Sequence, residues 1–450
     1  MRRTGLLLCC LLLFSCAGIR RPLEERAPLI RVGLFEDAVR CSFDNDTPFD
    51  LAILDSGRHE RITRRGLWDV RFQSPDTAGS RSPGLILTAP DGETWSCRKG
   101  VRLSAEKLTI RDVPAGEGFH WARLESRTYS GVIEFIIRRN GVTAVNELRL
   151  EDYLKGVLPG EMNAAFPLEA LKAQAIVART FCLRHLGRLH REAPFDVCDD
   201  VHCQVFTGRG DSEKHARAVD ETRSLCLTFR DELCETPYSA VCGGHTEAAS
   251  NAWSGQGYPY LLGRLDAVVP DHLQGALDLS SEEMARRWIR SRPQVNCFVE
   301  PEQESGFADY SRKYFRWQHR FTREKLESII RTRVEDIGSL LDIVPLRRGV
   351  SGRLIEVRLV GTRKAVTVSK ELNIRRALSE SALYSACFYI EREGAAGQLP
   401  RAFTIIGAGW GHGVGMCQIG AGILASRGTD AAEILSFYYP GTEIVDFYRK

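Results

Sequence analysis

Residues 154–180 read LKGVLPGEMNAAFPLEALKAQAIVART, and they combine a helix with an isolated carboxylate. Pro167 suits the first position of a helix, the alanines and leucines after it favour continuation, and Gly187 can end the helix in a left-handed conformation. Glu161 is predicted to lie off this helix, in an apolar loop that follows a Pro-Gly pair. Desolvation disfavours a charged carboxylate, so these surroundings predict that Glu161 keeps its proton near neutral pH.

This stretch resembles the signature of the stage II sporulation protein D and amidase-enhancer family, and further motifs follow in order. They are VNELRLEDYL at 145–154, CQVF at 203–206, GGHT at 243–246 and GAGWGHGVGM at 407–416. The resemblance covers residues 130–262 and 348–445. Members of the family are lytic transglycosylases of bacterial cell-wall glycan or helpers of cell-wall amidases. The resemblance implies that Glu161, the glutamate of the Glu-Met pair, is the catalytic acid.

Lytic cleavage of peptidoglycan needs only one acid. Glu161 would protonate the glycosidic oxygen at C1 of N-acetylmuramic acid and then accept the proton of that sugar's C6 hydroxyl, which closes a 1,6-anhydro ring. No second carboxylate stands at an obvious matching position, although Asp199, Asp200 or Glu247 could approach in the fold. Two alternatives stay open: a non-catalytic wall-binding protein that stimulates an N-acetylmuramoyl-L-alanine amidase, and a zinc hydrolase.

A cluster of potential zinc ligands follows the predicted helix. It comprises His190, Cys198, His202 and Cys203. Thiolate and imidazole are the ligands that zinc prefers, and some members of the resembled family hold zinc in this region. Four protein ligands leave no position for an activated water, so we expect a structural ion that holds the loop in place. The alternative is a Cys198–Cys203 disulfide with solvated histidines.

Several polar and aromatic residues are candidates for contact with the glycan. The C-terminal motif has a glycine at every second position, so an extended strand would put the glycines on one face and Trp410 and His412 on the other. An aromatic ring and an imidazole suit sugars, and the alternative is tight packing with His412 in the core. Lys172 and Arg179 lie on one helical face, either towards a glycan groove or in solvent. Gln418 continues the family pattern.

The N-terminus predicts export. Two arginines precede an apolar run that ends in LFSC at residues 13–16, which resembles a bacterial lipobox with Cys16 as the lipidated residue. The run is too short to remain as a membrane-spanning helix, and the alternative is ordinary signal cleavage. We therefore expect an exported protein, periplasmic or at the cell surface, that a lipid anchors to the membrane. In an oxidising compartment Cys226 and Cys234, which flank a predicted turn, are the likeliest disulfide pair.

The composition fits a multi-domain enzyme. The chain has 450 residues, 43% of them hydrophobic, and a net charge of +3 without a basic tract, so nucleic acid is not an expected partner. Glycan strands and a cell-wall amidase are the expected partners.

We predict an α+β fold of short strands with one prominent helix after the catalytic loop, in two lobes around a groove. The predicted parts are a signal peptide with lipobox at 1–16, a β-rich domain at 17–125, a first part of the catalytic core at 126–263, an inserted helical segment at 264–347 with helices around 281–290 and 323–333, and a second core part at 348–450.

Overall fold

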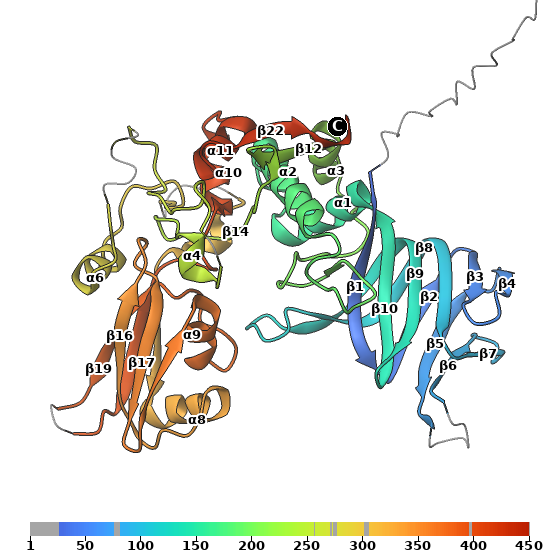
Figure 1. The fold of residues 1–450 in the computed structure, drawn as a ribbon, viewed down its shortest axis with the longest axis horizontal. Coiled ribbons are helices and arrows are strands. Elements are labelled where there is room, and N and C mark those ends of the chain that lie inside the picture. The colour runs from blue at the N-terminus through green and yellow to red at the C-terminus, as the bar shows by residue number, and fades with distance from the viewer. Residues whose placement is uncertain are drawn as a thin grey trace, which may run out of the picture.

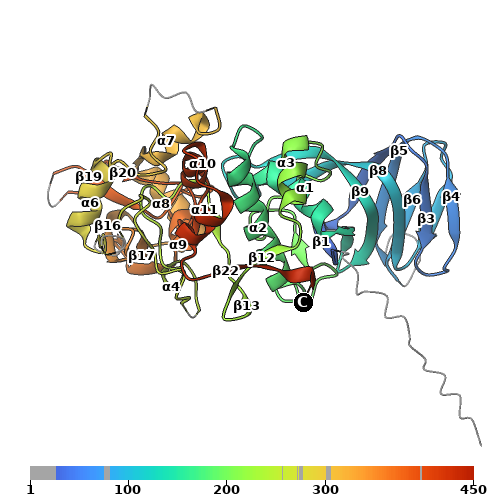
Figure 2. The same cartoon turned by 90° about the horizontal axis from the view of Figure 1, so that it is seen from above.

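The computed structural model describes residues 27–75, 82–255, 257–270, 272, 277–300, 306–395 and 398–449. A large sheet lies at one end of the molecule, helices occupy the centre, and a second strand-rich part lies at the other end (Figures 1 and 2). This mixture of strands and helices confirms the α+β class. The predicted signal peptide and the predicted lipidation of Cys16 lie outside the described residues. Within the described ranges, no helix is both long and apolar enough to cross a bilayer.

The N-terminal part is an eleven-stranded sheet. Its strands are β1 (Leu29–Ala38), β2 (Arg40–Asn45), β3 (Phe49–Ile53), β4 (His59–Ile62), β5 (Gly66–Gln73), β6 (Gly84–Thr88), β7 (Thr94–Cys97), β8 (Gly100–Ala115), β9 (Arg123–Arg138), β10 (Gly141–Arg149) and β11 (Val197–Cys198). The main path runs β11-β1-β10-β9-β8-β2-β5-β6-β7, and β3 pairs with β8 and β4. Buried aromatic rings such as Phe43 and Trp68, stacked 5.8 Å apart, fill the core beneath it.

The predicted boundary at residue 125 is wrong. Strand β9 runs through this position and pairs with both β8 and β10, so the sheet continues to the start of the first helix. Even β11, which follows the helices at residues 150–161 and 168–185 in the chain, joins the sheet beside β1. The β-rich part and the first part of the predicted core therefore share one sheet.

Five helices form the centre of the molecule. They are α1 (Leu150–Glu161), α2 (Leu168–His185), α3 (Glu213–Glu221), α10 (Gln418–Ser426) and α11 (Ala431–Tyr438). Helix α2 contacts the other four and buries side chains around most of its circumference. Gly187 follows it with φ of +64°, which confirms the predicted left-handed stop. Because α10 and α11 come from the C-terminus, this centre joins distant segments of the chain.

Two small sheets accompany these helices. One contains β12 (Leu225–Phe229), β13 (Glu232–Leu233) and β22 (Glu443–Asp446), and the other pairs β14 (Tyr238–Ser239) with β21 (Met416–Cys417). The β12–β13 turn at Arg230 and Asp231 confirms the predicted hairpin. The flanking Cys226 and Cys234 are buried and free, so the disulfide we expected there is not formed in the structure.

The second strand-rich part has its own hydrophobic core. This part contains two three-stranded sheets. One has the strand order β15 (Trp317–Thr322), β20 (Ala402–Gly407), β19 (Phe388–Glu393), and the other has the order β16 (Leu340–Arg348), β17 (Leu354–Gly361), β18 (Ala365–Ser369). The helices in this region are α4 (Ala249–Ala252), α6 (Glu282–Arg290), α7 (Arg312–Phe315), α8 (Arg323–Arg333) and α9 (Glu371–Ala377). Helices α6 and α8 confirm two predicted helices. Short 3₁₀ turns lie at Asp309–Ser311 and Phe447–Arg449.

Residues 264–347 are not a separate helical insertion. Strand β15 pairs with β20, and β16 pairs with β17, so this segment contributes strands to sheets that residues 348–407 complete. The charged helices α6 and α8 are present in this segment, but they alternate with strands that have no strong sequence signal of their own. The β8–β9 hairpin also reaches this part, because Phe119 near its tip lies beneath Arg375 and His120 contacts Trp410 (Figure 1).

Candidate active site

Glu161 is the last residue of α1, not a loop residue as we predicted from the Pro-Gly pair. The helix continues for two residues beyond Pro159, whose missing amide removes the bond to the carbonyl of Lys155, and the amide of Met162 still donates to the carbonyl of Leu158 at 2.8 Å. Gly160 packs against the backbone of Val205, where a Cβ would collide. The end of α1 and the 203–206 motif are therefore held together at Glu161.

The carboxyl of Glu161 is largely buried, and burial raises its pKa. The amide of Val205 donates to Oε1 at 2.8 Å, and the side chains of Tyr238 and Gln418 lie near the carboxyl as further donor groups. These donors lower the pKa, the charge of Asp200 raises it, and the net direction is upward. The negative end of the α1 dipole acts in the same direction as burial. Glu161 can thus hold a proton and also has donors ready for its carboxylate form.

The parallel pair β14–β21 brings the two side-chain donors to Glu161. Tyr238 pairs with Met416, and Gln418 comes two residues later at the start of α10. Gln204 donates to the Tyr238 hydroxyl at 3.2 Å and accepts from Tyr153 at 3.3 Å, so an aromatic and amide network extends from the carboxyl into the core.

The structure places Gln418 beside Glu161. Its Nε2 donates to Gln174 of α2 at 3.4 Å. Sequence reasoning missed Tyr238, since a single tyrosine between motifs carries no distinctive spacing. It also missed Gln204, although this residue belongs to the quoted CQVF motif.

His412 lies near the same network. Burial, followed by the charges of Arg353 and Arg375, lowers the pKa of His412 to about 3, so the imidazole is neutral. Its Nδ1 accepts from the amide of Val414 at 3.0 Å, and the ring also interacts with the backbone of Tyr238. A neutral imidazole here can orient a hydroxyl group but does not supply a positive charge.

The glycine-rich motif is not an extended strand, so the predicted alternation of faces is wrong. Strand β20 ends at Gly407, and Gly409, Gly411, Gly413 and Gly415 have φ of +82°, +99°, +75° and +71°. Such angles favour glycine, and a Cβ on Gly413 would also strike the guanidinium of Arg353.

Trp410 and His412 consequently make separate aromatic contacts. The Trp410 ring lies 4.1 Å from that of Tyr314, and the His412 ring lies 4.8 Å from that of Trp253. Trp253 is 42% exposed, so part of its ring is open to solvent. It is a further residue that the sequence did not single out.

Arg179 is not a groove residue, which corrects the prediction of glycan contact. Its side chain is fully buried in a bidentate ion pair with Glu151, at 2.9 and 2.7 Å. The remaining guanidinium hydrogens point at backbone carbonyls, including that of Leu225 at 3.2 Å. Lys172 is partly exposed, and its ammonium lies 2.8 Å from Glu169 and 2.6 Å from Glu221.

Of the three carboxylates that could assist Glu161, two are committed elsewhere. Asp199 is buried beside Arg127 at 2.8 Å, and Glu247 accepts from the Ser351 hydroxyl at 2.6 Å. Asp200 is the third of these carboxylates, and its negative charge raises the pKa of Glu161. Its Oδ2 accepts from the amide of Glu117 at 3.1 Å, so the β8–β9 hairpin tip helps to position it.

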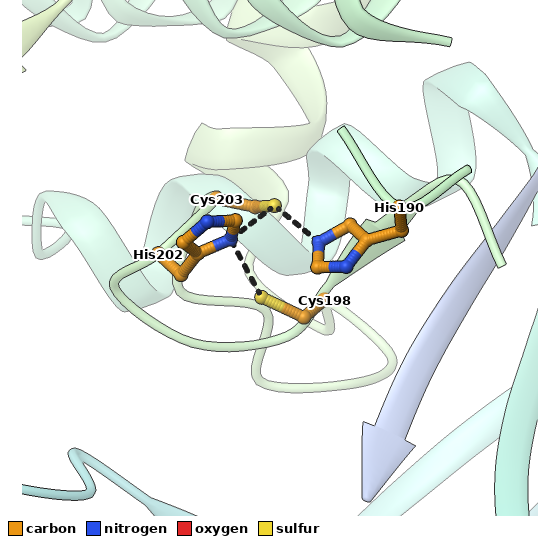
Figure 3. A group of neighbouring side chains, drawn as sticks. All are labelled: His190, Cys198, His202 and Cys203. Carbon is orange, nitrogen blue, oxygen red and sulfur yellow. Dashed lines mark hydrogen bonds between the residues drawn. The ribbon is translucent and has the colours of Figure 1, made fainter. Parts of the chain in front are cut away.

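The structure brings together all four predicted zinc ligands (Figure 3). His190 Nε2 lies 3.2 Å from Cys203 Sγ, and His202 Nδ1 lies 3.4 Å from Cys203 Sγ and 3.8 Å from Cys198 Sγ. In a tetrahedral zinc site, bonds of about 2.3 Å to sulfur and 2.0 Å to nitrogen separate such atoms by about 3.5 Å. Both cysteines are free. The donor set and spacing fit one tetrahedral ion.

Comparison with known proteins defines the class. Residues 138–229, which include Glu161, match the family model for Stage II sporulation protein, and residues 247–415 match a domain of unknown function, DUF8618. An uncharacterized protein of Brachyspira hyodysenteriae is 32% identical over 322 residues, which cover 71% of this chain and 73% of the relative. The chain belongs to the stage II sporulation protein D family.

Two further relatives come from Bacillus subtilis. Stage II sporulation protein D is 25% identical over 360 residues, which cover 77% of this chain and 87% of the relative. The amidase enhancer is 28% identical over 296 residues, which cover 65% of this chain but only 40% of the enhancer. The family membership that the motifs predicted is thereby confirmed.

Proposed function

We propose that the protein is a lytic transglycosylase that cleaves peptidoglycan glycan strands after N-acetylmuramic acid, with Glu161 as its acid and base. The observation that carries this proposal is the environment of one carboxyl. Burial raises the pKa of Glu161, while the amide of Val205 donates a hydrogen bond to the carboxyl and the nearby Tyr238 and Gln418 offer further donors to its ionised form. A group that first donates and then accepts a proton needs both features.

The cleavage proceeds in two proton transfers. Glu161 gives its proton to the glycosidic oxygen as the C1–O bond of N-acetylmuramic acid breaks, and its carboxylate then takes the proton of the C6 hydroxyl of the same sugar. The C6 oxygen bonds to C1, so the product ends in a 1,6-anhydro ring and no water is consumed. The hydroxyl of Tyr238 and the amide of Gln418 stabilise the carboxylate between the two transfers.

The glycan is proposed to run in a groove between the helical centre and the second strand-rich part. Trp253 supports this path, since its exposed ring offers a platform for a sugar face and its neighbour His412 offers a neutral imidazole to hydroxyl groups. Trp410, which packs against Tyr314, would contribute one wall of the proposed groove.

A zinc ion bound by His190, Cys198, His202 and Cys203 is proposed as a structural element. Four protein ligands close a tetrahedral site, so the ion would supply a cross-link and not an activated water. The loop that it would fix ends at Val205, which donates to Glu161. This closed ligand set favours lytic cleavage over the zinc-hydrolase alternative.

The proposed location of the protein, outside the cytoplasm and anchored to a membrane, rests on its N-terminal sequence. The lipobox-like LFSC motif supports export and anchoring through lipid on Cys16, on the periplasmic side or at the cell surface. The glycan substrate lies in the same place, so the location and the proposed activity agree.

Mass spectrometry of peptide-stripped glycan strands tests the activity. The wild-type protein should release 1,6-anhydro ends and the Glu161→Gln variant should release none. Glu443→Gln, the same chemical change at an exposed position of β22, is the matched control and should behave as wild type. Intact strands with all three proteins would refute the proposal.

A second candidate function is stimulation of a cell-wall amidase without cleavage, because the amidase enhancer of Bacillus subtilis is among the relatives. A purified N-acetylmuramoyl-L-alanine amidase distinguishes the two. If the helper function is correct, the amidase should release stem peptides faster with either the wild type or Glu161→Gln, and neither protein should alter the glycan ends.

A further inference from the structure

A second group of metal-binding side chains lies in the core, and no sequence motif marks it. Its members are Cys242, Asp266, Cys297 and Cys417, and one ligand atom of each lies within 4.8 Å of all the others. All four side chains are almost completely buried, between 0% and 2% exposed. Burial of a carboxyl among three thiols is unfavourable unless a proton or a cation accompanies it.

The spacing of these atoms fits a single small cation. Cys242 Sγ lies 3.5 Å from Cys297 Sγ and 3.2 Å from Asp266 Oδ2. Around a tetrahedral zinc ion, bonds of about 2.3 Å to sulfur and 2.1 Å to oxygen place two sulfurs about 3.8 Å apart and a sulfur and an oxygen about 3.6 Å apart. The four ligands therefore need only small movements to bind. The four ligand atoms lie close enough together to surround one metal ion, and this spacing is too small for a multi-iron cluster.

Groups around the cluster already orient the carboxylate. Tyr438 donates to Asp266 Oδ1 at 2.8 Å, and the amide of Cys297 donates to Oδ2 at 3.1 Å. Oδ1 is held by Tyr438 while Oδ2 faces the sulfurs, so each oxygen has a distinct role. Such outer contacts are typical of metal-binding carboxylates.

The surroundings also offset negative charge. Three thiolates and a carboxylate around Zn²⁺ leave two negative charges, and Cys417 Sγ accepts from the amide of Cys242 at 3.2 Å. Cys417 is the N-cap of α10, where the helix dipole favours a thiolate. The guanidinium of Arg316 donates to the carbonyl of Gly243 at 3.1 Å and interacts electrostatically with Cys242 and Cys297.

We propose that Cys242, Asp266, Cys297 and Cys417 bind a second zinc ion, in a closed and purely structural site. On binding, each thiol gives up its proton to solvent and four bonds to protein leave no open position on the metal. The ion joins Asp266 and Cys297 to the ends of β14 and β21. These strands carry Tyr238 and precede Gln418, so the ion would stabilise the pair that faces Glu161.

Metal stoichiometry of the purified protein tests this site independently of any activity. Wild type should hold two zinc ions per chain, Cys198→Ser should hold one, and Cys297→Ser should hold one. Combining the two substitutions should remove both ions. Cys387→Ser is the matched control, since Cys387 is equally buried but outside the cluster, and it should keep two.

X-ray absorption of the Cys198→Ser protein then identifies the ligands, because only the second ion remains. Three sulfur neighbours and one oxygen neighbour are expected. A zinc-free Cys198→Ser protein that is folded by circular dichroism would overturn the proposal, whatever its effect on glycan. A disulfide among Cys242, Cys297 and Cys417, detected as two missing thiols when the chain is denatured without reductant, would also overturn it.

If Cys297→Ser does not fold, Asp266→Asn provides the second test. The amide keeps the shape and the hydrogen bond from Tyr438 but binds zinc poorly, so zinc should dissociate at least tenfold more readily from this variant. Unchanged zinc retention would contradict the proposed ligand set.

Discussion

Replacement of Arg179 by methionine distinguishes a structural arginine from a substrate-binding one. Methionine fills the space of the aliphatic stem on α2 but removes the guanidinium, and Glu151 then keeps a buried charge without its partner. Tyr448 still donates to Glu151 at 2.6 Å, which offsets the loss only in part.

The expected cost follows from burial. Both side chains are at most 5% exposed. Removal of one partner from such a buried ion pair lowers the free energy of unfolding by about 3–5 kcal/mol. Lys172→Met, on the same helix but in a partly exposed ion pair, should cost less than about 1 kcal/mol. Adding Glu151→Gln to Arg179→Met should restore about 1–3 kcal/mol, because the uncompensated charge disappears.

Equilibrium urea unfolding, followed by far-ultraviolet circular dichroism, measures these free energies. Cleavage of glycan by the surviving folded protein is measured in parallel and should stay near the wild-type rate for Arg179→Met. The reasoning is refuted if Arg179→Met destabilises the protein no more than Lys172→Met does while it abolishes cleavage, since Arg179 would then act on substrate.

Three further outcomes are expected. Burial raises the folded-state pKa of Glu161 above its ordinary 4.5, so the folded state loses stability as the pH rises through the raised pKa. Glu161→Gln should therefore raise the melting temperature at pH 8 and leave it unchanged at pH 4. An equal shift of the melting temperature at both pH values would contradict this prediction. Asp200→Asn should move the alkaline limb of the activity profile to lower pH and leave 1,6-anhydro products, whereas complete loss would make Asp200 a second catalytic carboxylate. Cys203→Ser should lose one zinc ion and lower the melting temperature with unchanged product ends; full zinc retention would exclude Cys203 as a ligand.

Local signals in the sequence predicted much of the framework. Pro167 and Gly187 bracket α2, the predicted helices around 281–290 and 323–333 are α6 and α8, and the four ligands near residue 200 meet because only thirteen positions separate His190 from Cys203. These features depend on neighbours in the chain. They can be read without knowledge of the tertiary fold.

Features that depend on distant contacts could not be read. Alternating glycines fit both an extended strand and a series of left-handed turns, and only the contacts with Arg353 and other residues decide between them. Arg179 looked like a surface residue because the helical pattern cannot reveal that α2 is covered on nearly all sides. Cys242 and Cys417 are 175 residues apart, so no spacing rule links them.

Digestion of peptide-stripped glycan in water enriched with heavy oxygen tests the role of Glu161 most directly. If Glu161 acts as both acid and base on one sugar, every new N-acetylmuramic acid end should be a 1,6-anhydro ring without solvent oxygen, as measured by mass spectrometry. New reducing ends that carry heavy oxygen would contradict the account, because water and a second carboxylate would then have performed the cleavage.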